Sequence, residues 1–169
     1  DTALYPPRHW SLYGPPGAGK STFAASLRGP LLLVDADHRF AEVTALAGGD
    51  VFTVSDNPAD HIDAERIAAC LKAGMAGARI GTIVVDSLTA ILSPLVATAV
   101  MANDAGQYKN KMAAWKPKAM AMRVLQDAVT AYGTDTLWIY HDRPAMNAQA
   151  EAVTAPLSLI HISEPTRPY

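Results

Sequence analysis

The sequence holds a single cysteine, Cys70, among its 169 residues. One cysteine excludes a disulfide within the chain, so we expect a reducing, cytoplasmic setting. Cys70 lies among alanines in a predicted helix. We interpret it as a small buried apolar side chain rather than as a nucleophile.

Neither charge dominates the sequence, because 14 Lys and Arg stand against 16 Asp and Glu, for a net charge of −2. This balance excludes a protein that holds nucleic acid through bulk positive charge, and it leaves only a local contact. The most apolar region, residues 80–102, is interrupted by Asp86 and by Ser93-Pro94. We therefore expect a strand, a turn and a helix there and no membrane span.

What the sequence does contain is a glycine-rich loop near its beginning. The loop fits G-x-x-x-x-G-K-[ST] with a third glycine inside it, and its residues are Gly14, Pro15, Pro16, Gly17, Ala18, Gly19, Lys20, Ser21 and Thr22. Glycines let the backbone curl around a polyphosphate, so that successive N–H groups point at its oxygens. We expect Lys20 to reach the β- and γ-phosphates of ATP, and the Ser21 hydroxyl to join the shell of a Mg²⁺ ion.

Apolar runs of strand length alternate with helical patterns along the chain. The patterns predict strands at residues 9–13, 31–34, 51–54, 82–86 and 136–140, and helices at 23–27, 40–46, 58–73, 94–101 and 122–132. Residues 103–117 break the pattern and are predicted to be irregular. Runs that are apolar on both faces indicate parallel strands covered by helices. The predicted fold is an α/β P-loop NTPase with a doubly wound, mainly parallel sheet.

Acidic residues follow two of the apolar strands. Asp86 ends the strand at 82–86, where its carboxylate could hold a Mg²⁺-bound water opposite Ser21. Alternatively, Asp86 or Ser87 caps the next helix. Asp35 and Asp37 are candidates for aligning the attacking water or accepting a substrate proton, and the alternative for both is an acidic turn at a strand end.

His141 ends the last predicted strand, where it is a candidate sensor of the γ-phosphate, a partner contact or a merely solvated side chain. The other histidines, His9, His38, His61 and His161, lack the spacing of transition-metal ligands. Residues Tyr108 to Lys118 interleave Tyr108 and Trp115 with four lysines. This combination is typical of contact with single-stranded nucleic acid, and the alternative is a solvated surface loop.

Residues 158–169 fit neither the period nor the composition of what precedes them. They resemble translated sequencing-adapter read-through, and we interpret them as a non-native tail that has replaced the genuine C-terminus. We expect residues 1–157 to form one nucleotide-binding domain.

Three stretches together resemble the core of RecA-type recombinase ATPases: the glycine-rich loop, Leu33–His38, and Thr82–Ala90 followed by Ser93-Pro94. More narrowly, residues 10–141 resemble short phage-encoded RecA-like proteins of single-strand annealing and recombination. The resemblance implies Asp86 as the Walker B acid, Asp37 in the place of the catalytic glutamate and His141 as a polar sensor. It also implies a DNA-contacting loop at 103–118 and a homo-oligomer with nucleotide at its interface, in the cytoplasm of a bacterial host.

The sequence therefore favours a Mg²⁺-dependent ATPase whose nucleotide controls contact with single-stranded DNA. Lys20, Asp37, Asp86 and His141 are its candidate catalytic residues. One alternative is a small-molecule kinase that uses Asp35 and Asp37 as a substrate clamp. Another is a nucleotide-gated binding subunit with negligible turnover.

Overall fold

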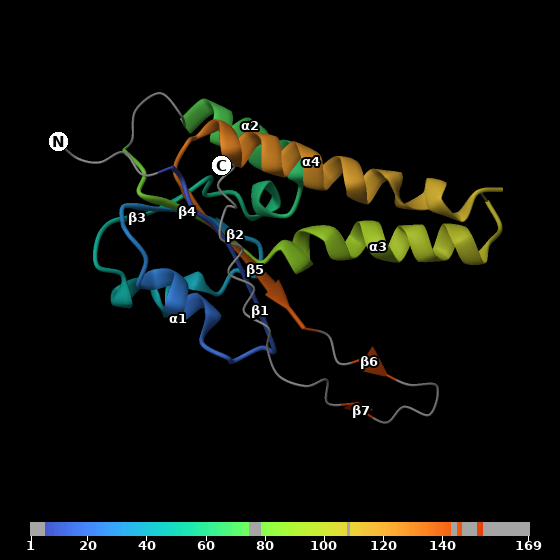
Figure 1. Ribbon diagram of the computed structural model, residues 1–169, viewed down its shortest axis with the longest axis horizontal. Helices are drawn as coiled ribbons and strands as arrows, with labels where there is room; N and C mark the ends of the chain where they lie inside the picture. Colours follow the sequence, from blue (N-terminus) through green and yellow to red (C-terminus); the bar gives the residue numbers. More distant parts are fainter. Residues whose placement is uncertain (1–5, 75–78, 108, 143–144, 147–151, 154–169) are drawn as a thin grey trace, which may run out of the picture.

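The computed structural model describes residues 6–74, 79–107, 109–142, 145–146 and 152–153. Its centre is a five-stranded sheet in the order β1-β5-β4-β2-β3, with every neighbouring pair parallel (Figure 1). The strands are β1 (His9–Gly14), β2 (Leu31–Asp35), β3 (Val51–Thr53), β4 (Thr82–Asp86) and β5 (Asp135–His141). A separate antiparallel pair joins β6 (Ala145–Met146) to β7 (Ala152–Val153). The parallel α/β fold predicted from the sequence is confirmed.

Helices cover both faces of the sheet. The α-helices are α1 (Lys20–Ala25), α2 (Ala64–Gly74), α3 (Leu88–Asp104) and α4 (Lys116–Ala131), and the short 3₁₀ helices are η1 (Phe40–Glu42), η2 (Thr44–Leu46), η3 (Pro58–His61) and η4 (Lys111–Trp115). Helix α1 lies on one side of the sheet, and α2, α3 and α4 lie on the other (Figure 1). None of the helices in the described ranges has the length and apolarity to cross a membrane.

Strand β2 illustrates how the two hydrophobic cores form. Successive side chains of a strand point to opposite faces. Leu31 and Leu33 therefore pack with the α1 residues on one face, whereas Leu32 and Val34 pack with α2, α3 and α4 on the other. All four side chains are buried. The continuous apolar run seen in the sequence is explained by this double coverage.

The helix bounds differ from the prediction at α3. We expected a helix over 94–101, but it runs from Leu88 to Asp104 with Pro94 inside. The Ser87 side chain accepts a hydrogen bond from the Ala90 N–H and so caps the helix directly after β4. The proline lacks an N–H, yet the helix continues through it, so proline was a misleading start signal here.

Two further expectations about helices were wrong in part. The helix predicted over 58–73 is divided into η3 and α2, because the Asp63 carboxylate accepts hydrogen bonds from the N–H groups of Glu65 and Arg66 and starts a new helix. The region predicted as irregular at 103–117 includes η4, and α4 already begins at Lys116 with a proline in its first turn.

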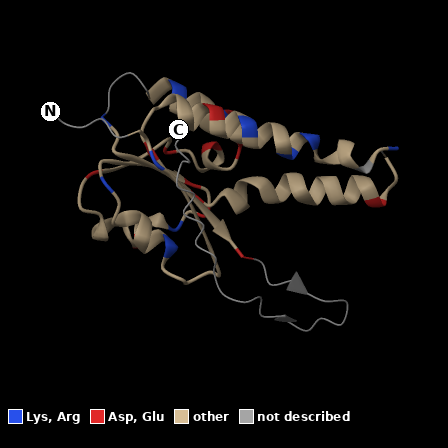
Figure 2. Ribbon diagram, in the orientation of Figure 1, with Lys and Arg blue, Asp and Glu red and all other residues tan. Residues whose placement is uncertain are grey.

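Helices α3 and α4 lie side by side and project beyond the sheet as an arm (Figure 1). We call residues 97–123 the arm tip. Its centre is a small apolar cluster in which Ala99, Ala102 and Ala114 are buried and Trp115 packs against them. Lysine and arginine residues recur along α4, whose ribbon is blue at several places in Figure 2. The arm thus has a small hydrophobic core of its own, and α4 carries the basic residues Lys116, Lys118 and Arg123.

Candidate functional site

The glycine-rich loop connects β1 to α1. Gly17 and Gly19 adopt positive φ angles of 79° and 80°, a conformation that side chains other than glycine adopt at a cost. A Cβ at either position would meet no atom of the protein within 4 Å. Backbone conformation, and not crowding by the protein itself, therefore requires glycine here.

Lys20 begins α1 and is 6% exposed. Its Nζ donates hydrogen bonds to the carbonyl oxygens of Gly14 at 2.8 Å and Pro15 at 2.7 Å. Burial lowers the pKa of Lys20, and the carboxylates of Asp86 and Asp37 oppose this shift. The ammonium is thus held inside the loop, where the phosphates of a nucleotide are expected.

Ser21 and Asp86 meet across the end of the sheet. Ser21 Oγ donates a hydrogen bond of 2.7 Å to Asp86 Oδ2, and Asp86 is 3% exposed. Burial raises the pKa of Asp86, the hydrogen bond from Ser21 lowers it, and the nearby charge of Asp37 raises it again. Because Ser87 caps α3, the carboxylate of Asp86 is left to face Ser21. The peptide bond between Asp86 and Ser87 is cis.

The structure separates the two acids that follow β2. The Asp35 carboxylate accepts hydrogen bonds from the N–H groups of Arg39 at 3.2 Å and Phe40 at 3.1 Å, so it fixes the turn into η1. Asp37 lies beside Asp86, because its own N–H donates to the Asp86 carbonyl oxygen at 3.3 Å. Of the two candidates, Asp37 is the one whose carboxylate lies with Asp86 and His141.

His141 reaches Asp37 from the end of β5. The distance from His141 Nε2 to Asp37 Oδ2 is 2.6 Å. The His141 N–H donates to Thr89 Oγ1 at 2.9 Å, which ties the strand end to the first turn of α3. His141 Nδ1 is buried with no hydrogen-bond partner among the described residues. Nε2 is therefore the ring nitrogen that faces the acids.

The register of the sheet explains why these side chains converge. Gly14 of β1 lies opposite His141 of β5, and Asp35 of β2 lies opposite Asp86 of β4. Parallel strands therefore end together, and the loops that follow them meet at one edge. An open cleft of about 640 Å³ adjoins this edge, lined by Pro16, Asp37, Ser87, Thr89, Ala90, Ser93, His141 and Asp142.

Two residues of this edge were missed by the sequence reasoning. His61 is 4% exposed, its Nδ1 accepts a hydrogen bond from the Asp35 N–H at 2.9 Å, and its Nε2 lies 2.7 Å from the Ser55 carbonyl oxygen. No local sequence pattern predicts the contact between His61 and Asp35, because the two residues come from separate segments. Thr89 could have been predicted, because a polar residue that closely follows a buried strand lies at the edge where the strands end.

The predicted nucleic-acid segment lies on the arm, away from this edge of the sheet. Trp115 packs against the buried alanines of the arm tip, and Lys118 Nζ lies 5.8 Å from the centre of its ring. Tyr108 lies outside the described residues. The indole thus already has a structural role in the arm, which sequence reasoning did not foresee.

Comparison with known families assigns the chain. Residues 7–153 match a family model described as an AAA domain. The chain belongs to the AAA domain family. This AAA domain is a P-loop NTPase fold, as its loop, its parallel sheet and the acid ending β4 also indicate. No curated protein matches the chain.

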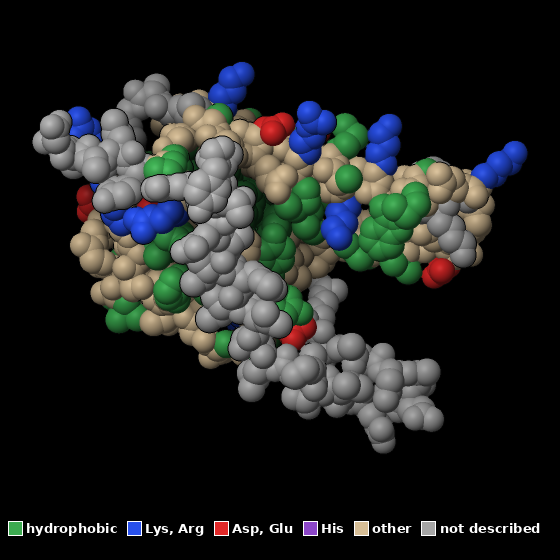
Figure 3. Space-filling view, in the orientation of Figure 1, with side chains coloured by type: hydrophobic (Ala, Val, Ile, Leu, Met, Phe, Trp, Pro, Cys, Tyr) green, Lys and Arg blue, Asp and Glu red, His purple; other side chains and the backbone are tan. Residues whose placement is uncertain are grey.

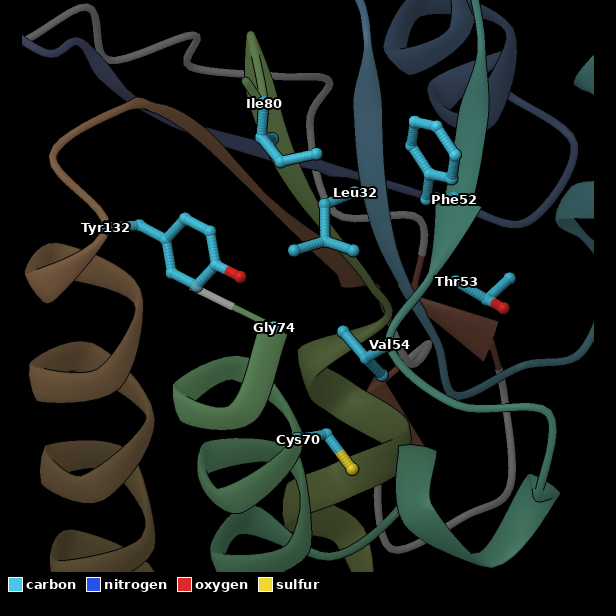
Figure 4. A pocket seen from close by; sticks show the side chains of 8 residues that line it. All are labelled: Leu32, Phe52, Thr53, Val54, Cys70, Gly74, Ile80 and Tyr132. Carbon is cyan, nitrogen blue, oxygen red and sulfur yellow. The ribbon is translucent and has the colours of Figure 1, made fainter. Parts of the chain in front are cut away.

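The AAA domain has a second cavity, which is separate from the strand ends that carry the acids. It encloses about 170 Å³ between β2, β3 and the C-terminal end of α2, and its lining is mostly apolar: Leu32, Phe52, Thr53, Val54, Cys70, Gly74, Ile80 and Tyr132 (Figure 4). Cys70 lies at one end of it and is partly exposed, so its predicted full burial is not observed. Burial nevertheless raises the pKa of its thiol, which keeps the thiolate nucleophile scarce at neutral pH.

Proposed function

We propose that this AAA domain binds ATP with Mg²⁺ and hydrolyses it at the edge where β1, β4 and β5 end. The observation that carries the proposal is the contact of 2.7 Å between Ser21 and Asp86, beside the buried ammonium of Lys20. A hydroxyl and a carboxylate are hard oxygen ligands, which Mg²⁺ prefers. The residues present therefore fit the ion that the family implies.

Each residue has a distinct task in this proposal. Lys20 and the N–H groups of the loop bind the phosphates, and Ser21 and Asp86 hold the Mg²⁺. Asp37 orients the attacking water, and His141 keeps the Asp37 carboxylate in place through the hydrogen bond of 2.6 Å. When bound, Mg²⁺ neutralises charge on the phosphates. The chain then needs mainly to position the reactants.

We further propose that bound nucleotide controls contact of the arm with single-stranded DNA, in recombination or annealing of the phage type. Lys109, Lys116 and Lys118 support this proposal, because they supply local positive charge on a chain of net charge −2. Since the partly buried Trp115 packs against the alanines of the arm tip, we assign the DNA contact to the lysines and the phosphate backbone rather than to base stacking on this indole.

The two alternatives differ in what the geometry offers them. A small-molecule kinase with an Asp35 and Asp37 clamp loses one acid, because the Asp35 carboxylate is occupied by two backbone N–H groups. The cleft beside Asp37 still leaves room for an acceptor. A nucleotide-gated subunit with negligible turnover requires the same nucleotide site without an effective Asp37.

One assay separates these functions: release of inorganic phosphate from ATP, with and without single-stranded DNA, for the wild type and Lys20→Ala. Stimulation by DNA supports the proposal, and transfer of phosphate to a metabolite supports the kinase. Binding without turnover supports the gated subunit. For Lys20→Ala we expect loss of ATP binding with an unchanged circular dichroism spectrum, and Lys72→Ala on α2 is the matched control. Unchanged ATP affinity in Lys20→Ala would contradict the nucleotide site itself.

A further inference from the structure

Three side chains from different segments converge at the edge of the sheet. Asp86 ends β4, Asp37 follows β2 and His141 ends β5, and one ligand atom from each lies within 4.8 Å of the other two. We propose that these residues form a site for a transition-type divalent cation, which the chain binds in the absence of nucleotide and for which Mn²⁺ serves as the probe. The proposal deepens the proposed function, on which it rests for the catalytic use of the ion.

The kind of ligand decides the kind of ion. Mg²⁺ in nucleotide sites takes one or two carboxylates together with phosphate oxygens and water. Imidazole nitrogen suits transition-type ions such as Zn²⁺, Fe²⁺ and Ni²⁺, whereas carboxylates suit Mg²⁺ and Mn²⁺. His141 adds such a nitrogen to two carboxylates, so the chain alone offers three protein ligands. An ion can therefore be held before any phosphate arrives.

The distances are compatible with one ion between the three groups. Ligands at about 2.1 Å from an octahedral ion lie about 3 Å from their neighbours and about 4.2 Å from the ligand opposite. The His141 Nε2 and Asp37 Oδ2 atoms are 2.6 Å apart, and the whole set lies within 4.8 Å. The closest pair must open by about 0.4 Å, and a pair at the upper bound of 4.8 Å must close by about 0.6 Å. The cation would take the place of the hydrogen bond that now joins His141 Nε2 and Asp37 Oδ2.

Charge at this edge also favours a cation. Asp86 is 3% exposed, and Ser21 is the side chain that donates to it. Asp37 and Asp35 add negative charge nearby. The Lys20 ammonium interacts with Asp86 and Asp37, but it donates its hydrogen bonds to two loop carbonyls. A buried carboxylate with acidic neighbours is costly unless a positive group balances it. A divalent ion beside Asp37, Asp86 and His141 supplies that balance.

The test uses the full chain without nucleotide. Mn²⁺ is titrated into the protein and free Mn²⁺ is followed by its electron paramagnetic resonance signal, which weakens as the ion binds. We expect one bound Mn²⁺ per chain in the wild type, and affinity at least about tenfold lower in His141→Ala. Zn²⁺ and Co²⁺ should displace the bound Mn²⁺ at lower concentration than Mg²⁺. His38→Asn is the matched control, because His38 neighbours Asp37, has a φ of 55° that asparagine tolerates, and is not part of the cluster.

A second measurement does not depend on a variant. Pulsed electron paramagnetic resonance of wild-type protein with bound Mn²⁺ should show coupling to an imidazole nitrogen. Absence of Mn²⁺ binding, absence of that coupling, or equal affinity in His141→Ala overturns the inference. ATP binding measured on the same preparations separates the two proposals. Normal MgATP binding without a Mn²⁺ site contradicts the cation site and leaves the proposed function standing. Mn²⁺ binding without ATP binding supports the cation site and contradicts the proposed function.

Discussion

His141 Nε2 and Asp37 Oδ2 lie 2.6 Å apart although 104 positions separate the two residues in the sequence. The pair joins the end of β5 to the segment after β2, across the end of β4. Aspartate is one methylene shorter than the glutamate of the family that the sequence resembles. In the proposed mechanism the neighbouring imidazole compensates for this, because it fixes the direction in which the shorter carboxylate points.

Asp37→Asn should slow phosphate release by about 100-fold or more while ATP binding is retained, because the amide is a poor acceptor for the proton of the attacking water. Phosphate release and ATP affinity are measured separately. Asp35→Asn is the matched control. It should weaken the turn into η1 and lower the free energy of unfolding by about 0.5–2 kcal/mol, with little effect on the rate. Equal rates in the wild type and Asp37→Asn would remove Asp37 from the mechanism.

Asp86→Asn should stabilise the fold in the absence of divalent ions, by about 0.5–2 kcal/mol at neutral pH, and abolish Mg²⁺-dependent hydrolysis. Burial raises the pKa of Asp86, so the folded state binds its proton more tightly than the unfolded state does. The wild type therefore loses stability as pH rises from the unfolded pKa through the folded one. The advantage of the variant should shrink as pH falls through that same range. Thermal melts of both proteins across this range check the sign, and a variant that is less stable at neutral pH would contradict it.

The DNA proposal makes a prediction about salt. The double variant Lys109→Ala, Lys116→Ala should bind single-stranded DNA more weakly. The negative slope of log affinity against log salt should become shallower by about 1 for each phosphate that the variant no longer neutralises. Fluorescence anisotropy of labelled DNA at several salt concentrations measures both effects. Lys72→Ala, a lysine on α2 away from the arm, is the control. An unchanged slope in the double variant would move DNA contact elsewhere or exclude it.

The arm tip also exposes apolar side chains. Met101, Met112 and Met120 are 70%, 73% and 58% exposed, and green side chains gather along α3 and α4 in Figure 3. Trp115 should matter more to the arm than these methionines do, because it packs against its buried alanines. Trp115→Ala is expected to cost about 3 kcal/mol or less of local stability, given its partial burial. Faster amide hydrogen exchange confined to residues 97–123 would show it, and unchanged exchange there would contradict it.

The fold could be predicted because its signals are local. Buried parallel strands are apolar on both faces, as Leu31–Val34 and Ile83–Val85 are, and the glycine-rich loop has a fixed spacing. Helix boundaries were less predictable. Both Ser87 and Pro94 are residues that typically begin a helix. In the structure α3 begins after the Ser87 cap, next to β4.

The sequence predicted which residues belong to the candidate site, but not how they are arranged in space. Asp37, Asp86 and His141 each follow an apolar strand, which marks them individually. Their mutual geometry depends on the strand order β1-β5-β4-β2-β3, and this order is a long-range property of the sheet. For the same reason the sequence could not show that Asp35 holds a turn whereas Asp37 contacts His141. The hydrogen bonds that occupy Asp35 come from a turn whose conformation the sequence does not specify.

Gly81, just before β4, offers a test of what positions Asp86. A Cβ at Gly81 would lie 2.5 Å from the carbonyl oxygens of Arg28 and Gly29, closer than real contacts allow. The backbone has little room to yield, because the Gly81 N–H donates to the Pro30 carbonyl oxygen at 2.8 Å and the Gly81 carbonyl accepts from Thr134 Oγ1 at 2.9 Å.

Gly81→Ala should therefore lower the free energy of unfolding by about 1–3 kcal/mol, measured by urea denaturation. Gly48→Ala should change it by about 0.5 kcal/mol or less, because a Cβ there meets no atom within 4 Å. If the clash shifts β4 along its axis, Asp86 moves away from Ser21, and affinity for MgATP falls together with stability. If the chain yields near Gly29 instead, stability falls and MgATP affinity is kept. The two measurements together locate the strain, and a neutral Gly81→Ala would mean that β4 is not fixed at its start.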